Sequence, residues 1–321
     1  MLSPKDISQI ESERISLNQV KNQIERFKKG FKSPRLSASA TAGNGIIRFS
    51  ESEIEEYSKI YEESEKSVLK FVPASGAATR MFKPLFEFLD ENQNNEIINS
   101  FFECLSDFAF YNELKLSFEK TYGHSIEQAL AGENYHDILK FLLLEEGLGY
   151  GNLPKGLLTF HQYEGNSRTP LEEHIQEGIM YANNADLINI HFTVSPAHHH
   201  LFVKRATQAI SELAQNLKIN IDYSFQEPST NTLAVDLENN PFRAEDDTLL
   251  FRPAGHGALL ENLNNLDADI IFVKNIDNVL PDRLKGDTVT YKKLLAGVLL
   301  CYQDKAFTLL HLFDKGEYVK K

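Results

Sequence analysis

The stretch VLKFVPASGAATRM, residues 68–81, decides the fold class of this chain. Its first five residues form a short apolar run that stops at Pro73, which is typical of a strand buried on both faces. Small residues then lead into a helical pattern that begins at Met81. A buried strand, a small-residue turn and a helix in this order predict an α/β protein.

The chain beyond residue 187 alternates between strands and helices. Alternation of this length favours a largely parallel sheet that helices cover on both faces. Ligands of such sheets bind beyond the carboxyl ends of the strands. We predict strands at 187–194, 219–225 and 270–273, shorter strands near 233–235 and 249–251, and helices at 197–217 and 257–266.

Other segments carry apolar residues at helical spacing. Residues 3–30 fit one capped helix, and residues 32–45 form a connector rich in small residues. We therefore divide the chain into an N-terminal helix and linker, 1–48, and a larger domain, 49–321, with a helical insertion at about 81–150. Further helices are predicted at 50–66 and 294–313.

Composition excludes several classes of protein. Among 321 residues, 33 are Lys or Arg and 46 are Asp or Glu, so the net charge of −13 disfavours nucleic acid as a partner. The N-terminus carries charges throughout, and no apolar run is long enough to span a membrane, so we expect a cytoplasmic protein without a membrane partner. The two cysteines, Cys104 and Cys301, lie in apolar helical contexts, and we expect both in the core.

The loop after the first strand is a candidate phosphate site. Its small side chains let backbone N–H groups approach phosphate oxygens, and the helix that follows adds a favourable dipole. The same composition is also typical of a tight turn that binds nothing. The candidate residues are Ser75, Gly76, Ala77, Ala78, Thr79 and Arg80.

A second candidate is Lys155, which stands between Pro154 and Gly156. A lysine on a defined backbone can hold a positive charge against a phosphate. The alternative is an ordinary solvated loop lysine. Thr169 and Pro170 then predict the capped start of a helix.

Two later elements are also candidates. In FRPAGHGALL, residues 251–260, a strand ends in Gly255, His256 and Gly257, where glycines let the backbone reach a base edge or a phosphate. In DIIFVKNIDNV, residues 269–279, an apolar strand runs into Asp277, a carboxylate placed to hold Mg²⁺ against phosphates. Each element taken alone also fits turn chemistry.

These elements, in this order, resemble the UDP-sugar pyrophosphorylases. The small-residue loop before Thr79-Arg80-Met81 resembles that family's Gly-rich loop, and Pro154-Lys155-Gly156 resembles its Pro-Lys-Gly segment. Phe225-Gln226 resembles its Phe-x-Gln strand. The Gly-His-Gly and Asn-Ile-Asp-Asn pair, about 20 residues apart, is the most specific part. The chain resembles even more closely a bacterial family of unknown function, DUF4301.

The resemblance implies a Rossmann-like, mixed but mostly parallel sheet of the nucleotide-diphospho-sugar transferase type, and a nucleotidyltransferase that joins UTP or another nucleoside triphosphate to a sugar 1-phosphate. Arg80 and Lys155 would neutralise the triphosphate and the leaving pyrophosphate. Gln226 and the backbone at 255–257 would read the base, and Asp277 would bind Mg²⁺. Such a reaction depends on alignment and charge stabilisation.

The chain departs from that family at three places. Gly76 is a lone glycine among alanines and a serine, the helical insertion separates Arg80 from Lys155, and about 40 residues follow Asp277, which leaves little chain for a sugar-binding half. The chain therefore fits either a domain truncated at its C-terminal end or a domain whose substrate is not a sugar. Two alternatives stay open: a nucleotide- or nucleotide-sugar-binding protein without catalysis, and a glycosyltransferase on the same fold. The sugar, the base and the oligomeric state are not determined by the sequence.

Two clusters of potential metal ligands have simpler interpretations. Neighbouring residues of a helix point in different directions, so His198, His199 and His200 cannot all bind one ion, and we expect surface or helix-start histidines. Asp246 and Asp247 fit a hairpin turn.

Overall fold

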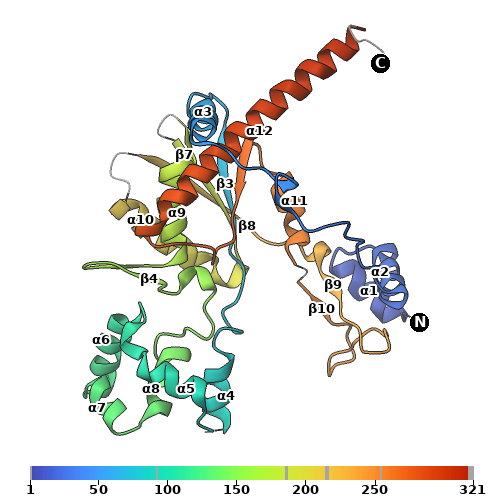
Figure 1. Cartoon of the computed structure of the whole chain (residues 1–321). Coiled ribbons are helices and arrows are strands. Elements are labelled where there is room, and N and C mark those ends of the chain that lie inside the picture. The colour runs from blue at the N-terminus through green and yellow to red at the C-terminus, as the bar shows by residue number, and fades with distance from the viewer. Residues whose placement is uncertain (1, 92, 185–186, 214–216, 254, 317–321) are drawn as a thin grey trace.

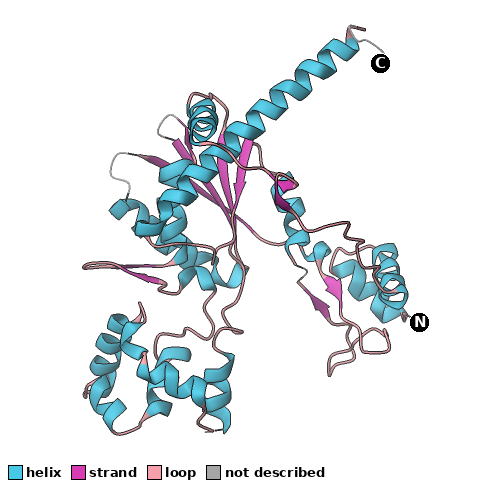
Figure 2. Cartoon of the chain, viewed as in Figure 1, coloured by secondary structure: helices cyan, strands magenta, loops and turns pink. Residues whose placement is uncertain are grey.

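A mostly parallel β-sheet with packed helices forms the centre of the molecule (Figure 1, Figure 2). The computed structural model describes residues 2–91, 93–184, 187–213, 217–253 and 255–316. A group of short helices lies below the sheet in Figure 1, the N-terminal helices lie to its right, and the C-terminal helix extends away from it. The predicted α/β class and the mostly parallel sheet are confirmed.

The central sheet has the strand order β11-β3-β7-β8, and neighbours in this order run parallel. Strand β3 (Val68–Pro73) is the buried run that opens the predicted α/β unit. From β3 the chain adds β7 and then β8 on one side, and it returns to place β11 on the other. The further strands are β6 (Asn183–Asn184), which pairs antiparallel with the start of β7, β7 (Leu187–Thr193), β8 (Lys218–Ser224) and β11 (Ile270–Val273).

Apolar side chains on one face of the sheet hold the helices. Lys70 is opposite Ile190 and Phe272 in the register, so alternate residues of neighbouring strands share this face. It is covered by α9 (Pro170–Tyr181), α10 (His199–Leu213) and α12 (Lys285–Asp314), and α3 (Glu51–Glu62) packs against α12.

The opposite face is more polar, with Asn189, His191 and Asp222 at alternate positions. The short helix α11 (Leu260–Asn264) reaches it, where Asn262 Nδ2 donates to Ser224 Oγ and to the Phe225 carbonyl, both at 2.8 Å. The prediction that helices cover both faces is met unevenly in the described residues, because the long helices pack on the apolar face and the short helix α11 reaches the polar one.

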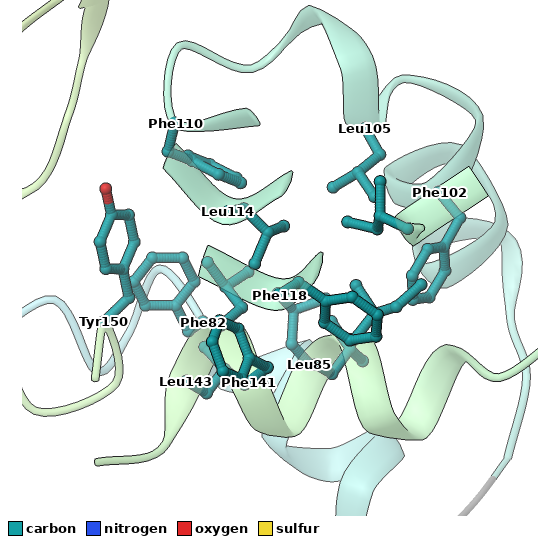
Figure 3. Packing of buried hydrophobic residues seen from close by; sticks show 14 of the residues in the cluster. Phe82, Leu85, Phe102, Leu105, Phe110, Leu114, Phe118, Phe141, Leu143 and Tyr150 are labelled. Atoms are coloured by element: carbon teal, nitrogen blue, oxygen red, sulfur yellow. The ribbon is translucent and has the colours of Figure 1, made fainter. Parts of the chain in front are cut away.

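The helical pattern predicted between 81 and about 148 is confirmed. Five short helices surround a hydrophobic cluster of their own, in which Leu114, Phe118 and Leu143 are fully buried (Figure 3). These helices are α4 (Lys83–Glu91), α5 (Glu96–Glu103), α6 (Tyr111–Tyr122), α7 (Ile126–Ala131) and α8 (Tyr135–Leu143), and we call them the helical segment. The division of the chain into domains stays a prediction.

The N-terminal region differs from the single helix predicted for residues 3–30. It forms α1 (Pro4–Ser12) and α2 (Leu17–Lys29), because the backbone at Arg14 has a φ of 57° and Ser16 caps a new helix. Ile10 and Val20 pack against Leu233 and Leu249. Both helices thus cover the hairpin of β9 (Thr232–Leu233) and β10 (Phe251–Arg252), which lies outside the central sheet.

Several smaller predictions are settled by the structure. Thr169 caps α9 together with Glu172, and α12 is one helix that begins earlier than expected. The three histidines lie at the start of α10, whose predicted C-terminal end includes residues outside the described ones. Asp246 and Asp247 form a turn, in which Ala244 N donates to the Thr248 carbonyl. The remaining two-residue strands are β1 (Thr41–Ala42), β2 (Gly45–Ile46), β4 (His161–Gln162) and β5 (Ser167–Arg168).

The prediction that both cysteines lie in the core is wrong. Cys104 ends α5 with its side chain exposed, and Cys301 is partly exposed on α12. Apolar neighbours in sequence misled the prediction, because these residues are on the outer sides of their helices. Among the described helices, α12 included, none combines the length and apolarity that a membrane span requires.

Candidate functional site

The candidate site lies where the strand order reverses. The chain progresses from β3 to β7 and β8 in one direction, and β11 then joins β3 on the opposite side. Because β3 and β11 are parallel neighbours, the loops that leave them emerge side by side at one edge of the sheet. Open α/β sheets form a ligand crevice at such a position.

A pocket of about 280 Å³ opens at this edge. Six of the residues selected from the sequence line it, although they come from five separate segments of the chain. The predicted residues in the pocket are Ser75, Gly76, Lys155, Gln226, Gly255 and Asp277, and the lining is completed by Pro73, Leu259, Asn275 and Ile276.

The backbone around Lys155 is fastened to the loop after β3. Lys155 N donates to the Gly76 carbonyl at 3.1 Å, and Ala77 and Pro154 form an isolated antiparallel bridge. Residues Lys155–Leu157 then form a single 3₁₀ turn. The helical segment separates the loop after β3 from Lys155 in sequence. The contact between their backbones brings Lys155 back to the pocket.

Lys155 and Asp277 form an ion pair in the wall of the pocket. The distance from Lys155 Nζ to Asp277 Oδ2 is 2.6 Å, and the two side chains are 29% and 40% exposed. Both groups therefore remain accessible to a ligand. A ligand with phosphate groups can bind the lysine in place of the aspartate, and a carboxylate at this position is a ligand that a divalent cation accepts.

The residues present fit one Mg²⁺ ion that is shared with a bound phosphate. Asp277 follows the carboxyl end of β11 and is partly open to solvent. Mg²⁺ takes one or two protein carboxylates and leaves its other positions to water and phosphate oxygens. Among the described residues, no group of three His, Cys, Asp or Glu side chains is gathered for a metal, so an ion here would depend on the ligand's own oxygens.

Gly76 and Gly156 serve different purposes in the pocket wall. A Cβ added at Gly76 would meet no atom within 4 Å, so the backbone there faces open space. A Cβ at Gly156 would lie 2.9 Å from Phe202 Cζ and 3.0 Å from Ile276 Cγ1. Gly156 is thus required for packing beneath the pocket, whereas Gly76 leaves room above it.

The loop after β11 contacts His174, a residue to which the sequence analysis assigns no role. His174 is fully buried on α9, and its Nε2 lies 3.1 Å from the Asn275 carbonyl and 3.2 Å from that of Ile276. Both partners are acceptors, so Nε2 carries the proton. Burial and then the charge of Lys70 hold the pKa of His174 well below its ordinary value, so the ring is neutral.

Other predicted residues do not line the pocket. Ala78 is buried in the cluster of the helical segment, and Thr79 and Arg80 follow it in an exposed turn. The wider phosphate loop therefore contributes only its first part, Ser75 and Gly76, to the pocket wall. Gly257 is exposed beside the pocket, while Ala254 and the side chain of His256 lie outside the described residues.

Gln226 and Gly255 also line the pocket. Gln226 follows the end of β8, and its Nε2 donates to Thr230 Oγ1 at 3.3 Å. Gly255 precedes the 3₁₀ turn His256–Leu259 that leads into α11. The side-chain amide of Gln226 and the backbone at Gly255 are neutral polar groups, which suit recognition of an uncharged ring.

The family of the chain follows from a comparison over nearly its whole length. The family model described as "Domain of unknown function (DUF4301)" matches residues 3–321. The chain belongs to the DUF4301 family. No curated protein and no solved structure matches it.

A buried charge cluster lies beneath the pocket of this DUF4301 chain. Glu177 accepts from Lys70 Nζ at 2.9 Å and from Lys274 Nζ at 2.6 Å, and all three side chains are buried. Burial acts to raise the pKa of Glu177, but its positive neighbours, Lys70 first, lower it to about 2. Burial lowers the pKa of Lys70 to about 7, against the opposing effect of Glu177. One carboxylate thus faces two buried ammonium groups in this cluster.

A second charge network fastens the chain after Asp277 to the chain after Lys155. Arg168 Nη1 donates to both carboxylate oxygens of Asp282, at 2.8 and 2.9 Å, and Lys285 contacts Glu173 and Asp282. Glu173 and Lys285 are fully buried. In the DUF4301 chain these contacts connect the β4–β5 hairpin, which follows Lys155, to the start of α12, which follows Asp277.

Proposed function

We propose that this DUF4301 chain is a nucleotidyltransferase that joins a nucleoside triphosphate, UTP in the first instance, to a sugar 1-phosphate. The observation that carries the proposal is the pocket in which Gly76, Lys155 and Asp277 meet beside Gln226 and Gly255. The strand order, which reverses between β3 and β11, supports a Rossmann-like sheet of the nucleotide-diphospho-sugar transferase type.

In the proposed reaction, a phosphate oxygen of the sugar 1-phosphate forms a bond to the α-phosphorus of the nucleotide. The bond from that phosphorus to the oxygen bridging to the β-phosphorus breaks, and its electron pair leaves with pyrophosphate. Lys155 neutralises charge on the leaving group, and Arg80 approaches it from the exposed turn. Gln226 and Gly255 to Gly257 contact the base.

Asp277 would hold a Mg²⁺ ion in this proposal. When bound, such an ion supplies charge neutralisation and polarises phosphoryl oxygens. Lys155 exchanges its contact with Asp277 for a phosphate oxygen as the nucleotide enters, so the ion pair of the free protein positions the lysine before binding. Ser75 and Gly76, which carry little or no side chain, leave the path of the phosphates open.

Pyrophosphate release tests the proposal. The purified chain is incubated with Mg²⁺, a panel of nucleoside triphosphates and a panel of sugar 1-phosphates. We expect release that requires both substrates and falls by about 100-fold or more in Asp277→Asn, in line with the loss of one electrostatic contact at a transition state. Asp304→Asn on exposed α12 is the matched control and keeps full activity. Absence of pyrophosphate release with every pair contradicts the proposal.

The Lys155–Asp277 ion pair favours one alternative, a nucleotide- or nucleotide-sugar-binding protein without turnover. In that case Asp277 serves to orient the lysine. Thermal stabilisation by UTP or a UDP-sugar, without pyrophosphate release, identifies this alternative. Transfer of sugar from a UDP-sugar to an acceptor identifies a glycosyltransferase.

A further inference from the structure

A second pocket, of about 450 Å³, lies between β11 and α12 and is a neighbour of the first. The polar residues that line it are Lys274, Asn275, Asn278, Thr288, Tyr291 and Lys292. Asn275 lines both pockets, so the two spaces meet at the loop after β11. We call this space the lysine pocket.

Positive charge is concentrated around the lysine pocket. Lys274 is buried and shares the single carboxylate of Glu177 with Lys70. Lys292 adds a third ammonium group, and in the described part of the chain it forms no salt bridge; its Nζ lies 5.9 Å from the ring centre of Phe272. Burial and then the charge of Lys274 lower the pKa of Lys292. This local excess of positive charge contrasts with the net charge of −13 of the whole chain.

The polar groups of the lysine pocket are suited to an oxyanion. The wall contributes two amide side chains, the Thr288 hydroxyl and the Tyr291 hydroxyl beside the two ammonium groups, and no carboxylate of the described residues lines it. Lysine binds phosphate as a point charge, and hydroxyl and amide N–H groups donate to its oxygens.

We infer that the lysine pocket binds the phosphate of a phosphorylated acceptor, with Lys292 as its principal charge partner. The identity of that acceptor as a sugar 1-phosphate rests on the proposed function, whereas the anion site itself does not. Because Asn275 lies between the pockets, a phosphate held by Lys292 is adjacent to the nucleotide pocket, on the side of Asp277. The nucleophile then approaches from beyond the edge strand β11.

Binding of inorganic phosphate and of glucose 1-phosphate tests the inference. Calorimetric titrations at constant ionic strength compare the wild-type chain, Lys292→Met and Lys305→Met, which removes the same charge from an exposed position of the same helix. Losing a charge-assisted contact is expected to weaken phosphate binding by about 10-fold or more in Lys292→Met. Lys305→Met is expected to bind phosphate with wild-type affinity.

A second measurement requires no substitution. Acetylation of individual lysines, followed by mass spectrometry, is expected to slow at Lys292 when phosphate is added, and to proceed unchanged at Lys305. Equal phosphate affinity in wild type and Lys292→Met, no phosphate binding to the wild type, or protection of Lys155 in place of Lys292 overturns the inference.

Titration of UTP separates this inference from the proposed function. Lys292→Met is expected to bind UTP as the wild type does, because its lysine faces the other pocket. If the wild type binds no UTP and releases no pyrophosphate, but phosphate protects Lys292, the proposed function fails and the anion site stands.

Discussion

The pocket at the sheet edge and the cavity of the helical segment differ in chemistry more than in size. The cavity, about 380 Å³, is lined by apolar and aromatic side chains such as Phe82, Phe101 and Phe110. The smaller sheet-edge pocket contains Lys155 and Asp277. The same short loop serves both regions, because Gly76 faces the pocket while Ala78 is buried in the helical cluster. Size alone therefore does not identify the functional site, whereas converging polar groups from distant segments do.

The largest expected effect is a loss of stability in the helical segment that leaves ligand binding unchanged. Phe118 is fully buried in that cluster, and Phe118→Ala removes a ring that its neighbours cannot replace. We expect the free energy of unfolding to fall by about 3–5 kcal/mol in chemical denaturation. Leu116→Ala, on the exposed side of the same helix, is the control. Nucleotide affinity, measured under conditions in which the variant is folded, is expected to stay unchanged. A loss of nucleotide affinity in Phe118→Ala would show that ligand binding depends on the packing of the helical segment.

His174→Phe tests the support beneath the sheet-edge pocket. The substitution leaves the buried carbonyls of Asn275 and Ile276 without their donor, which costs about 1–3 kcal/mol of stability in thermal or chemical unfolding. We also expect weaker nucleotide binding, because Asp277 follows these two residues. A variant that loses stability while keeping wild-type nucleotide affinity would show that the loop needs no such support.

The two glycines provide a matched pair. Gly156→Ala forces a methyl group against Phe202 and Ile276 and is expected to lower the free energy of unfolding by about 1–3 kcal/mol. Gly76→Ala, where the added methyl meets open space, is expected to change stability by less than about 0.5 kcal/mol and to weaken nucleotide binding instead. If Gly76→Ala lowered stability in denaturation and left nucleotide affinity unchanged in titration, Gly76 would not be part of the nucleotide-binding site.

A pH-dependent effect, about 1 kcal/mol per pH unit, concerns the buried charge cluster of Lys70, Glu177 and Lys274. The pKa of Lys70 is lowered to about 7 in the folded chain, below the ordinary lysine value of 10.5, so the unfolded chain binds the extra proton between these values. Stability should therefore rise with pH from about 7 to 9.5, beyond which tyrosine ionisation in the unfolded chain opposes it. Lys70→Met should flatten this dependence in denaturation curves recorded across that range. An unchanged slope would mean that Lys70 keeps its proton.

Much of the site follows from local sequence signals. The apolar runs at 68–72 and 270–273, each followed by small or polar residues, correctly predict the parallel strands β3 and β11. Because neighbouring parallel strands end at the same edge of a sheet, the loops that follow β3 and β11 are expected to lie close together. The single α12 helix and the capped start of α9 were predictable for the same reason, since their signals are contained in neighbouring residues.

The remainder depends on contacts that a sequence does not display. The break at Arg14 is stabilised by packing of α1 and α2 on the β9–β10 hairpin, which is distant in sequence. His174 and Lys292 acquire their positions only when α9 and α12 pack against the sheet. Lys274 was visible in the strand motif, but a lysine after a buried strand does not reveal that it shares a glutamate with Lys70.

Calorimetric titration of Mg²⁺-UTP tests the central claim, that the loops after β3 and β11 and the Lys155 segment form one nucleotide pocket. The wild-type chain, Lys155→Met and Lys59→Met, which removes an exposed lysine of α3, are compared. The account predicts binding by the wild type and Lys59→Met, with affinity lower by about 10-fold or more in Lys155→Met. Equal affinities in all three proteins, or no binding by the wild type, would contradict it.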